Sequence, residues 1–326
     1  MASGNPLTQS EAARKKRTKV AAAIIFTAAP IVLVISCFLN NSRWHMLLSV
    51  LMLGVVIIPF FLVFERRKPK AREIVLIAVL SAITVVVHVF FHIILPLQIG
   101  TAMVIISGVS LGPEAGFLIG ALSRFVCNFF LGQGLWTPWQ MFCWGLLGFL
   151  AGLAFNRGNV EKVNSDHFKA VLGPVMTVIF AELIAYISFV VFPGPDESFF
   201  SWRIYAFGAV GLIVGVLIQR KRLPIDAATL VLFTFFTSFI LYGGIMNFAS
   251  MVTTMTITEV EVFSSNTLRL MYISGLPYDI LHAVTASICI LFLGKPMIRK
   301  LERIKTKFGL TGEEKRYVMP ESEAAG

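Results

Sequence analysis

The sequence predicts an all-α fold, a polytopic membrane bundle of about ten helical spans. The first observation behind this prediction is the composition, because the 326 residues are 56% hydrophobic and only 14% charged. A soluble domain usually carries charge on about a quarter of its residues. The second observation is a series of long apolar runs separated by short polar segments. The third is the placement of the basic residues, which gather between alternate runs.

The apolar runs follow a basic tail at residues 1–19. A helix crosses a hydrocarbon core of about 30 Å in about 20 residues, and most of the runs reach that length. The run at 99–111 is too short, so we expect a tilted or half-length helix shielded by neighbouring protein. The predicted spans are 20–39, 44–64, 72–95, 99–111, 113–131, 138–155, 170–192, 203–219, 224–247 and 270–293.

The basic residues predict the orientation of the bundle. Cytoplasmic segments of membrane proteins carry an excess of Lys and Arg, and a cytoplasmic N-terminus satisfies this rule. Of the 28 Lys and Arg residues, only Arg43, Arg124, Arg203 and Arg269 lie outside the segments then predicted to be cytoplasmic. Both termini are expected in the cytoplasm. The net charge of +10 is therefore attributed to topology and anionic-lipid contact, and nucleic-acid binding is not expected.

Two of the loops predicted on the outer side are notable. The loop around residues 132–140 lies between two glycine-containing helices, and a longer loop is expected at 248–269. In lipid, small residues on one helix face allow the close backbone contact that stabilises helix pairs. The glycines that predict such packing are Gly112, Gly116 and Gly120 before the first loop and Gly145, Gly148 and Gly152 after it.

Motifs for enzymatic or metal chemistry are missing from the sequence. It contains no GxxxxGK[ST] and no HExxH, so no catalytic residue is assigned. His88 and His92 have metal-compatible spacing, but two histidines without a third ligand are expected to be core or interface residues. The cysteines lie in apolar runs and are expected to act as small packing residues; they are Cys37, Cys127, Cys143 and Cys289.

Ionisable groups inside membrane spans are costly and therefore become candidate functional residues. Arg124 and Asn128 lie four residues apart and are expected on one helix face toward the outer loop. They either contact a ligand or are held by structural partners. Glu182 lies in the middle of the span at 170–192 and either pairs with Arg124 or faces a cavity.

Further candidates lie in the last two spans. Asp279 and His282 are one helical turn apart, with Tyr278 beside them, and they could hydrogen-bond each other. A structural pair or a ligand contact is favoured over a proton relay. Asn247 ends a predicted span at the outer surface, where its amide either binds a ligand or caps a helix.

The outer loop itself is rich in aromatic and amide side chains. Tryptophans at a membrane interface usually form an aromatic belt, and that interpretation applies to Trp136, Trp139 and Trp144. Two tryptophans that flank Thr137 and Pro138, with amides alongside, favour recognition of a polar organic molecule instead. The candidate residues of this loop are Gln133, Trp136, Thr137, Trp139 and Gln140.

Several short motifs together resemble a known family. They are Ala78-Val-Leu-Ser-Ala82, Leu111-Gly-Pro-Glu-Ala-Gly116, Gly132-Gln-Gly-Leu-Trp-Thr-Pro-Trp-Gln-Met141, Gly244-Ile-Met-Asn247 and Leu276-Pro-Tyr-Asp-Ile-Leu-His-Ala283. In order and spacing they resemble the substrate-binding S components of energy-coupling factor (ECF) vitamin transporters, and the cobalamin-type branch in particular. The resemblance covers residues 72–155 and 224–307.

The resemblance implies an organisation of the chain around a six-helix core. The basic tail and two extra spans at 1–71 precede this core, two inserted spans at 156–223 interrupt it, and a polar cytoplasmic tail at 308–326 follows. It also implies capture of a vitamin or vitamin precursor at the outer face. We assign the candidate substrate-binding residues as Arg124, Asn128, Gln133, Trp136, Thr137, Trp139, Gln140, Asn247, Tyr278, Asp279 and His282.

The implied partners are one coupling membrane subunit and two cytosolic ATPases. In S components the small-residue face of the first core helix docks on the coupling subunit, which assigns that role to Ala78 and Ala82. ATP is then used by the partner subunits, and the chain itself is expected to bind neither a cofactor nor a metal. Two rival interpretations are a stand-alone ion-coupled secondary transporter and a membrane-embedded enzyme or sensor.

Overall fold

The computed structural model describes residues 71–95, 97–155, 165–192, 198–218, 223–258 and 265–308, together with residues 20, 23, 27 and 54. The predicted N-terminal spans at 20–39 and 44–64 therefore lie almost wholly outside the described residues, as does the tail at 309–326. The regular structure in the described part is helical, which confirms the predicted all-α class. One isolated bridge joins Phe155 to Leu223.

Each predicted span from residue 72 onward corresponds to helix in the structure. The elements are α4 (Ala71–Ile94), α5 (Ile99–Leu111), α6 (Pro113–Leu131), α7 (Thr137–Ala154), α8 (Ser165–Val191), α9 (Trp202–Ile218), α10 (Ala227–Phe236), the π-helix η2 (Thr237–Gly243), α11 (Gly244–Thr258) and α12 (Ser265–Lys307).

Five segments of the described chain are long and apolar enough to cross a membrane. They support a multi-pass membrane protein, while the predicted total of about ten spans is not confirmed. α5 and α9 are apolar but shorter than a full span. The five segments are Ala71–Ile94, Pro113–Leu131, Leu172–Val191, Ala227–Thr254 and Asn266–Lys307.

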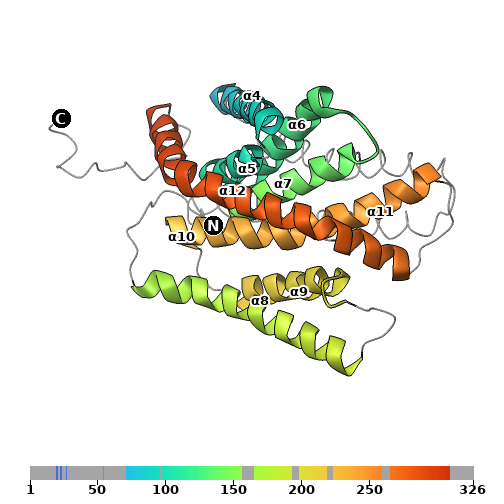
Figure 1. The fold of residues 1–326 in the computed structure, drawn as a ribbon. Coiled ribbons are helices and arrows are strands. Elements are labelled where there is room, and N and C mark those ends of the chain that lie inside the picture. The colour runs from blue at the N-terminus through green and yellow to red at the C-terminus, as the bar shows by residue number, and fades with distance from the viewer. Residues whose placement is uncertain are drawn as a thin grey trace, which may run out of the picture.

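The helices form three layers (Figure 1). α4, α5, α6 and α7 make the first, α10, α11 and α12 the second, and α8 and α9 the third. Within the first layer, α5 lies against the second, so that it contacts α4, α6 and α7 of its own layer and α12 of the next. Its 13 residues span about 20 Å, too little to cross a bilayer. Every α5 residue from Ile99 to Ser110 is buried, which confirms the predicted short, shielded helix.

The close approach of α6 and α7 depends on glycine. A Cβ added to Gly116 would meet the carbonyl oxygen of Gly148, and a Cβ on Gly148 would meet that of Gly116. A Cβ on Gly120 would meet the backbone of Trp144 in the same way. The prediction of glycine-mediated packing is therefore confirmed. Gly112 has another role, because its φ of 99° allows the chain to turn between α5 and α6.

Helix continues through much of the outer loop predicted at 248–269, so that prediction is wrong. α11 runs to Thr258 and α12 begins at Ser265, which leaves only 259–264 outside the described residues. Threonine is a poor helix former, but tertiary packing overrides propensity. Ala249 is buried in the core, and the Thr253 hydroxyl donates to its carbonyl oxygen at 2.7 Å.

α8 and α9 form a hairpin that joins the bundle through α9, which contacts η2, α11 and α12. Glycines of α9 face α8 at close range. A Cβ on Gly211 would lie 2.8 Å from the Cα of Val178, and a Cβ on Gly215 would lie 2.6 Å from the Thr177 hydroxyl oxygen. The hairpin therefore uses the same small-residue packing as α6 and α7.

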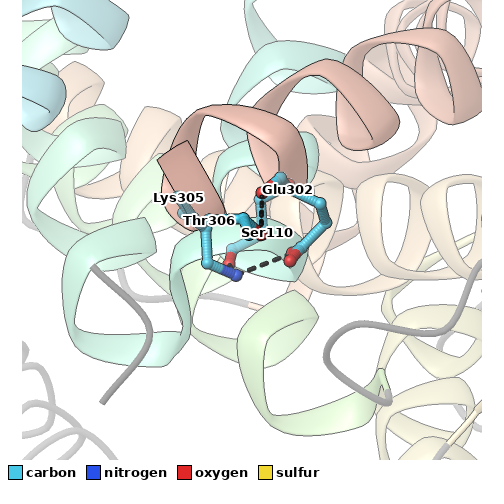
Figure 2. A network of polar contacts seen from close by, with 4 residues as sticks. All are labelled: Ser110, Glu302, Lys305 and Thr306. Carbon is cyan, nitrogen blue, oxygen red and sulfur yellow. Dashed lines mark hydrogen bonds and ion pairs between the residues drawn. The ribbon is translucent and has the colours of Figure 1, made fainter. Parts of the chain in front are cut away.

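A basic side chain holds α12 to the end of α5. Figure 2 shows Lys305 Nζ donating to the carbonyl oxygen of Ser110 at 2.7 Å and pairing with Glu302 at 2.7 Å. The last carbonyls of a helix lack intrahelical partners, and a cation near them is favourable. Arg72 at the start of α4 also donates to the carbonyl oxygen of Phe308, at 3.3 Å. This end of the bundle is the one predicted to be cytoplasmic.

Candidate functional site

A group of polar side chains lies between α4, α6 and α7, beside the loop that follows α6. We call it the Arg124 cluster, and its members are His88, Arg124, Asn128, Thr137, Gln140 and Trp144. Four of these residues were assigned to the substrate site from the sequence.

Arg124 joins the three helices. Its Nε donates to Gln140 Oε1 on α7 at 3.0 Å, and its Nη1 donates to His88 Nε2 on α4 at 3.1 Å. The guanidinium carbon also lies 5.1 Å from the centre of the Trp144 ring, within the range of a cation–π interaction. A positive charge is therefore held inside the bundle by neutral groups.

The contact with Arg124 fixes the proton on His88. A guanidinium can only donate hydrogen bonds, so Nε2 of His88 accepts and the ring proton resides on Nδ1. His88 is fully buried, and Nδ1 has no hydrogen-bond partner in the described structure. Space for the His88 and Trp144 rings comes from Gly100 on α5, where an added Cβ would meet both. The sequence did not identify His88 as the partner of Arg124.

Asn128 connects the cluster to the loop. Its Nδ2 donates to Thr137 Oγ1 at 3.1 Å and to Gln140 Oε1 at 2.9 Å. The Thr137 hydroxyl in turn donates to Gln133 Oε1 at 3.0 Å and accepts from the Gly134 N–H at 3.1 Å. The expected placement of Arg124 and Asn128 toward the loop is confirmed, while their role toward a ligand stays a prediction. Asn128 Oδ1 is buried without a partner.

The three tryptophans of this region differ in environment. Trp136 is 39% exposed, whereas Trp139 and Trp144 are 1% and 0% exposed. Trp139 packs in the core, with its ring centre 6.0 Å from that of Phe248 on α11. Trp144 lies beside Arg124 and His88, and its indole N–H is buried without a partner. Only Trp136 among them presents a surface-accessible ring.

His282 on α12 approaches the same region from the second layer. Its Nε2 lies 2.9 Å from the Thr101 hydroxyl on α5, and its ring centre is 4.3 Å from that of Tyr242 in η2. Tyr242 also packs against the apolar group that contains Trp144. His282, Tyr242 and Thr101 therefore adjoin the Arg124 cluster. Neither Thr101 nor Tyr242 was identified from the sequence.

Asp279 belongs to a different group of contacts. Its Oδ2 accepts from the Tyr205 hydroxyl of α9 at 2.5 Å and from Asn247 Nδ2 of α11 at 2.7 Å. Asp279 and His282 thus have separate partners and do not form the pair that their spacing suggested. Tyr278 is 75% exposed and takes no part in this group.

A rare helix type lies between the two groups. η2 is a π-helix, and such segments occur frequently at functional sites. Its Tyr242 contacts His282, and its Gly243 packs against the carboxyl group of Asp279, where an added Cβ would lie 2.7 Å from the carboxyl carbon. The sequence analysis had identified only the motif that follows it, Gly244-Ile-Met-Asn247 at the start of α11.

The remaining candidates have apolar or structural surroundings. The carboxyl oxygen of Glu182 faces Gly208 of α9. Glu182 does not pair with Arg124, one of the two expected arrangements; the hydrogen-bond partners of Arg124 are Gln140 and His88. Across the described chain, no group of three His, Cys, Asp or Glu residues could hold a metal ion. Cys127, Cys143 and Cys289 are buried free thiols, as expected for packing residues.

The fold and the site together define a multi-pass membrane protein with a charged polar cluster enclosed by its helices. Residues 68–194 match the family model of the ECF-type riboflavin transporter, S component. The match runs from just before α4 to just after α8, which is less than half of the chain, and it includes Ala78, Ala82 and the Arg124 cluster. No solved structure matches the chain.

The family match bears on several of the predictions. It supports the resemblance to an ECF S component and a substrate-specific transport subunit, and it confirms the prediction that the chain is not an enzyme. The match is to a riboflavin-type family, so the cobalamin-type branch is not confirmed. It also extends through α8, which was predicted to belong to the inserted segment at 156–223.

Proposed function

We propose that this chain is the substrate-specific S component of an ECF-type importer. It captures a vitamin or vitamin precursor at the outer face of the membrane and delivers it inward with a coupling membrane subunit and two cytosolic ATPases. The observation that carries the proposal is the family match over α4–α8, which contains the enclosed Arg124 cluster.

The proposed substrate site is the Arg124 cluster together with His282 and the Trp136 ring. Arg124, Asn128 and Gln140 supply hydrogen-bonding groups in a low-dielectric interior, where polar contacts discriminate strongly between ligands. Asp279 accepts hydrogen bonds from both Asn247 and Tyr205, so we give Asp279 and Asn247 a supporting role behind the site. Riboflavin is the first vitamin to test because of the family match, and cobalamin is retained because of the motif order.

The proposed docking face for the coupling subunit is the exposed side of α4. Ala78 and Ala82 are both exposed, and so are Val75 and Val86 on the same side of the helix. Alanines four residues apart allow another helix to approach closely. The distribution of Lys and Arg supports a cytoplasmic position for the start of α4.

Reconstitution tests this proposal directly. The chain is co-expressed with a coupling subunit and two ATPases, purified, and placed in liposomes with labelled riboflavin or cobalamin outside. We expect the four proteins to purify together and uptake to require ATP inside. Uptake by the chain alone, driven by an ion gradient and without ATPases, would instead support the stand-alone secondary transporter.

A further inference from the structure

The charge of Arg124 is not balanced by the protein around it. A charged side chain within a membrane bundle usually pairs with an opposite charge, because an unpaired ion in a low-dielectric region is costly. The hydrogen-bond partners of Arg124 are the amide of Gln140 and the imidazole of His88. No acidic side chain within the described ranges forms an ion pair with it.

The two neutral partners also leave part of the guanidinium free. The group has five N–H donors in a planar fork, and the contacts described above engage Nε and one N–H of Nη1. The remaining N–H groups have no partner in the part of the chain that the structure describes, and Arg124 is only partly buried. The described protein therefore does not enclose the Arg124 side chain completely.

Other unpaired polar atoms belong to the same cluster. The indole N–H of Trp144 and Oδ1 of Asn128 are buried and have no hydrogen-bond partner. Trp144 is 0% exposed and Asn128 is 1% exposed. Buried polar atoms left without partners are rare in native structures and call for a ligand, an ion or a water. With the unpartnered Nδ1–H of His88, two donors and one acceptor thus lie beside an uncompensated cation.

We propose that the Arg124 cluster binds an organic anion, a vitamin-sized molecule whose carboxylate or phosphate pairs with the free edge of the Arg124 guanidinium. This inference rests on the proposed function and names the class of its substrate. A planar guanidinium binds a carboxylate or phosphate through two parallel N–H···O bonds. A cationic ligand would be repelled at this position, and a neutral one would leave the partly buried charge uncompensated.

Matched pairs of vitamins that differ in charge test the proposal with the unmodified protein. The pairs are riboflavin and riboflavin 5′-phosphate, nicotinamide and nicotinate, and biotinamide and biotin. Binding is measured by titration calorimetry on protein purified in detergent and stripped of bound small molecules by washing. We expect at least one anionic member to bind at least about tenfold more tightly than its neutral counterpart, a difference of about 1.4 kcal/mol.

A charge variant then locates the effect. Arg124→Gln is expected to remove that preference. Arg299→Gln removes an exposed charge near the C-terminal end of α12, away from the cluster, and is expected to retain the preference. The proposal is wrong if the neutral members bind as tightly as the anions, or if none of the three anions binds. Because the pair comparison needs no variant, a folding defect of Arg124→Gln does not affect this outcome.

The result is separable from the proposed function. ATP-dependent uptake of a neutral vitamin by the assembled complex, with no preference for anions, would leave the S-component function intact and overturn the charge assignment. Anion binding by a chain that never assembles with a coupling subunit would support the charge assignment and overturn the S-component function.

Discussion

The hydroxyl of Tyr205 donates a hydrogen bond of 2.5 Å to Oδ2 of Asp279, which joins α9 of the hairpin to α12 of the main bundle. Asn247 donates to the same oxygen at 2.7 Å. The Tyr205 ring is also stacked on Phe239 of η2, with ring centres 5.3 Å apart. The hairpin is therefore attached beside the π-helix by one buried carboxyl group and an aromatic stack.

Tyr205→Phe tests this attachment. The substitution keeps the aromatic ring but leaves the buried oxygen of Asp279 with one donor in place of two, at a cost of about 1–3 kcal/mol. We expect a lower melting temperature of the purified protein in detergent. Tyr272→Phe is the matched control, because the Tyr272 hydroxyl donates to the neutral carbonyl of Gly244 at 2.8 Å. If Tyr272→Phe lowered the melting temperature more than Tyr205→Phe, the Tyr205–Asp279 hydrogen bond would not be the contact that attaches the hairpin.

Gly148→Ala tests the contact between α6 and α7. Its new Cβ would meet the carbonyl oxygen of Gly116, which belongs to the backbone and cannot rotate away. Overpacking of this kind costs about 1–3 kcal/mol or more, so we expect less monodisperse protein on gel filtration. Gly173→Ala in α8 is the control, because nothing lies within 4 Å of its added Cβ. Equal yields of the two variants would show that the helices can separate without loss of stability.

The features that could be predicted from the sequence were those encoded within one segment. The short apolar run at 99–111 predicted a short shielded helix. The glycine spacing within 113–131 predicted the face of α6 that packs against α7. A contact such as Tyr205–Asp279 joins residues 74 positions apart and leaves no local pattern. The loop predicted at 248–269 is largely helical, because burial of one helix face overrides the low helix propensity of its threonines.

The site was predicted to a similar extent. Asn128, Thr137 and Gln140 could be grouped because a short loop joins the two helices that carry them. The role of His88 as the partner of Arg124 could not be predicted, since spacing toward His92 suggested only a metal site or a core pair. Likewise, Trp139 was assigned to the ligand with Trp136, although burial places it against Phe248.

The two loop tryptophans make a testable contrast. Trp136 is partly exposed beside the Arg124 cluster, so Trp136→Ala should weaken vitamin binding without lowering the yield of folded protein. Trp139 is buried, and Trp139→Ala should lose about 3–5 kcal/mol of packing and reduce the yield. Titration with the vitamin measures the binding affinity of each variant, and gel filtration measures its yield of folded protein. Unchanged affinity in Trp136→Ala would assign that ring to an interfacial belt.

The docking face on α4 can be blocked without touching the site. Ala78→Trp combined with Ala82→Trp places two large rings where we propose that the coupling subunit approaches. We expect loss of co-purification with the coupling subunit and loss of ATP-dependent uptake, while vitamin binding by the isolated chain is retained. The physical reason is that a close helix contact through alanine has no room for indole rings.

A second double variant controls for the bulk of the added rings. Ile187 and Val191 are four residues apart on α8 and are 52% and 58% exposed. Ile187→Trp combined with Val191→Trp therefore adds the same two rings, at the same spacing, to an apolar helix face outside the proposed contact. This variant should assemble and transport normally. Normal uptake by the α4 variant, or equal loss in both variants, would show that the Ala78–Ala82 face is not where the coupling subunit binds.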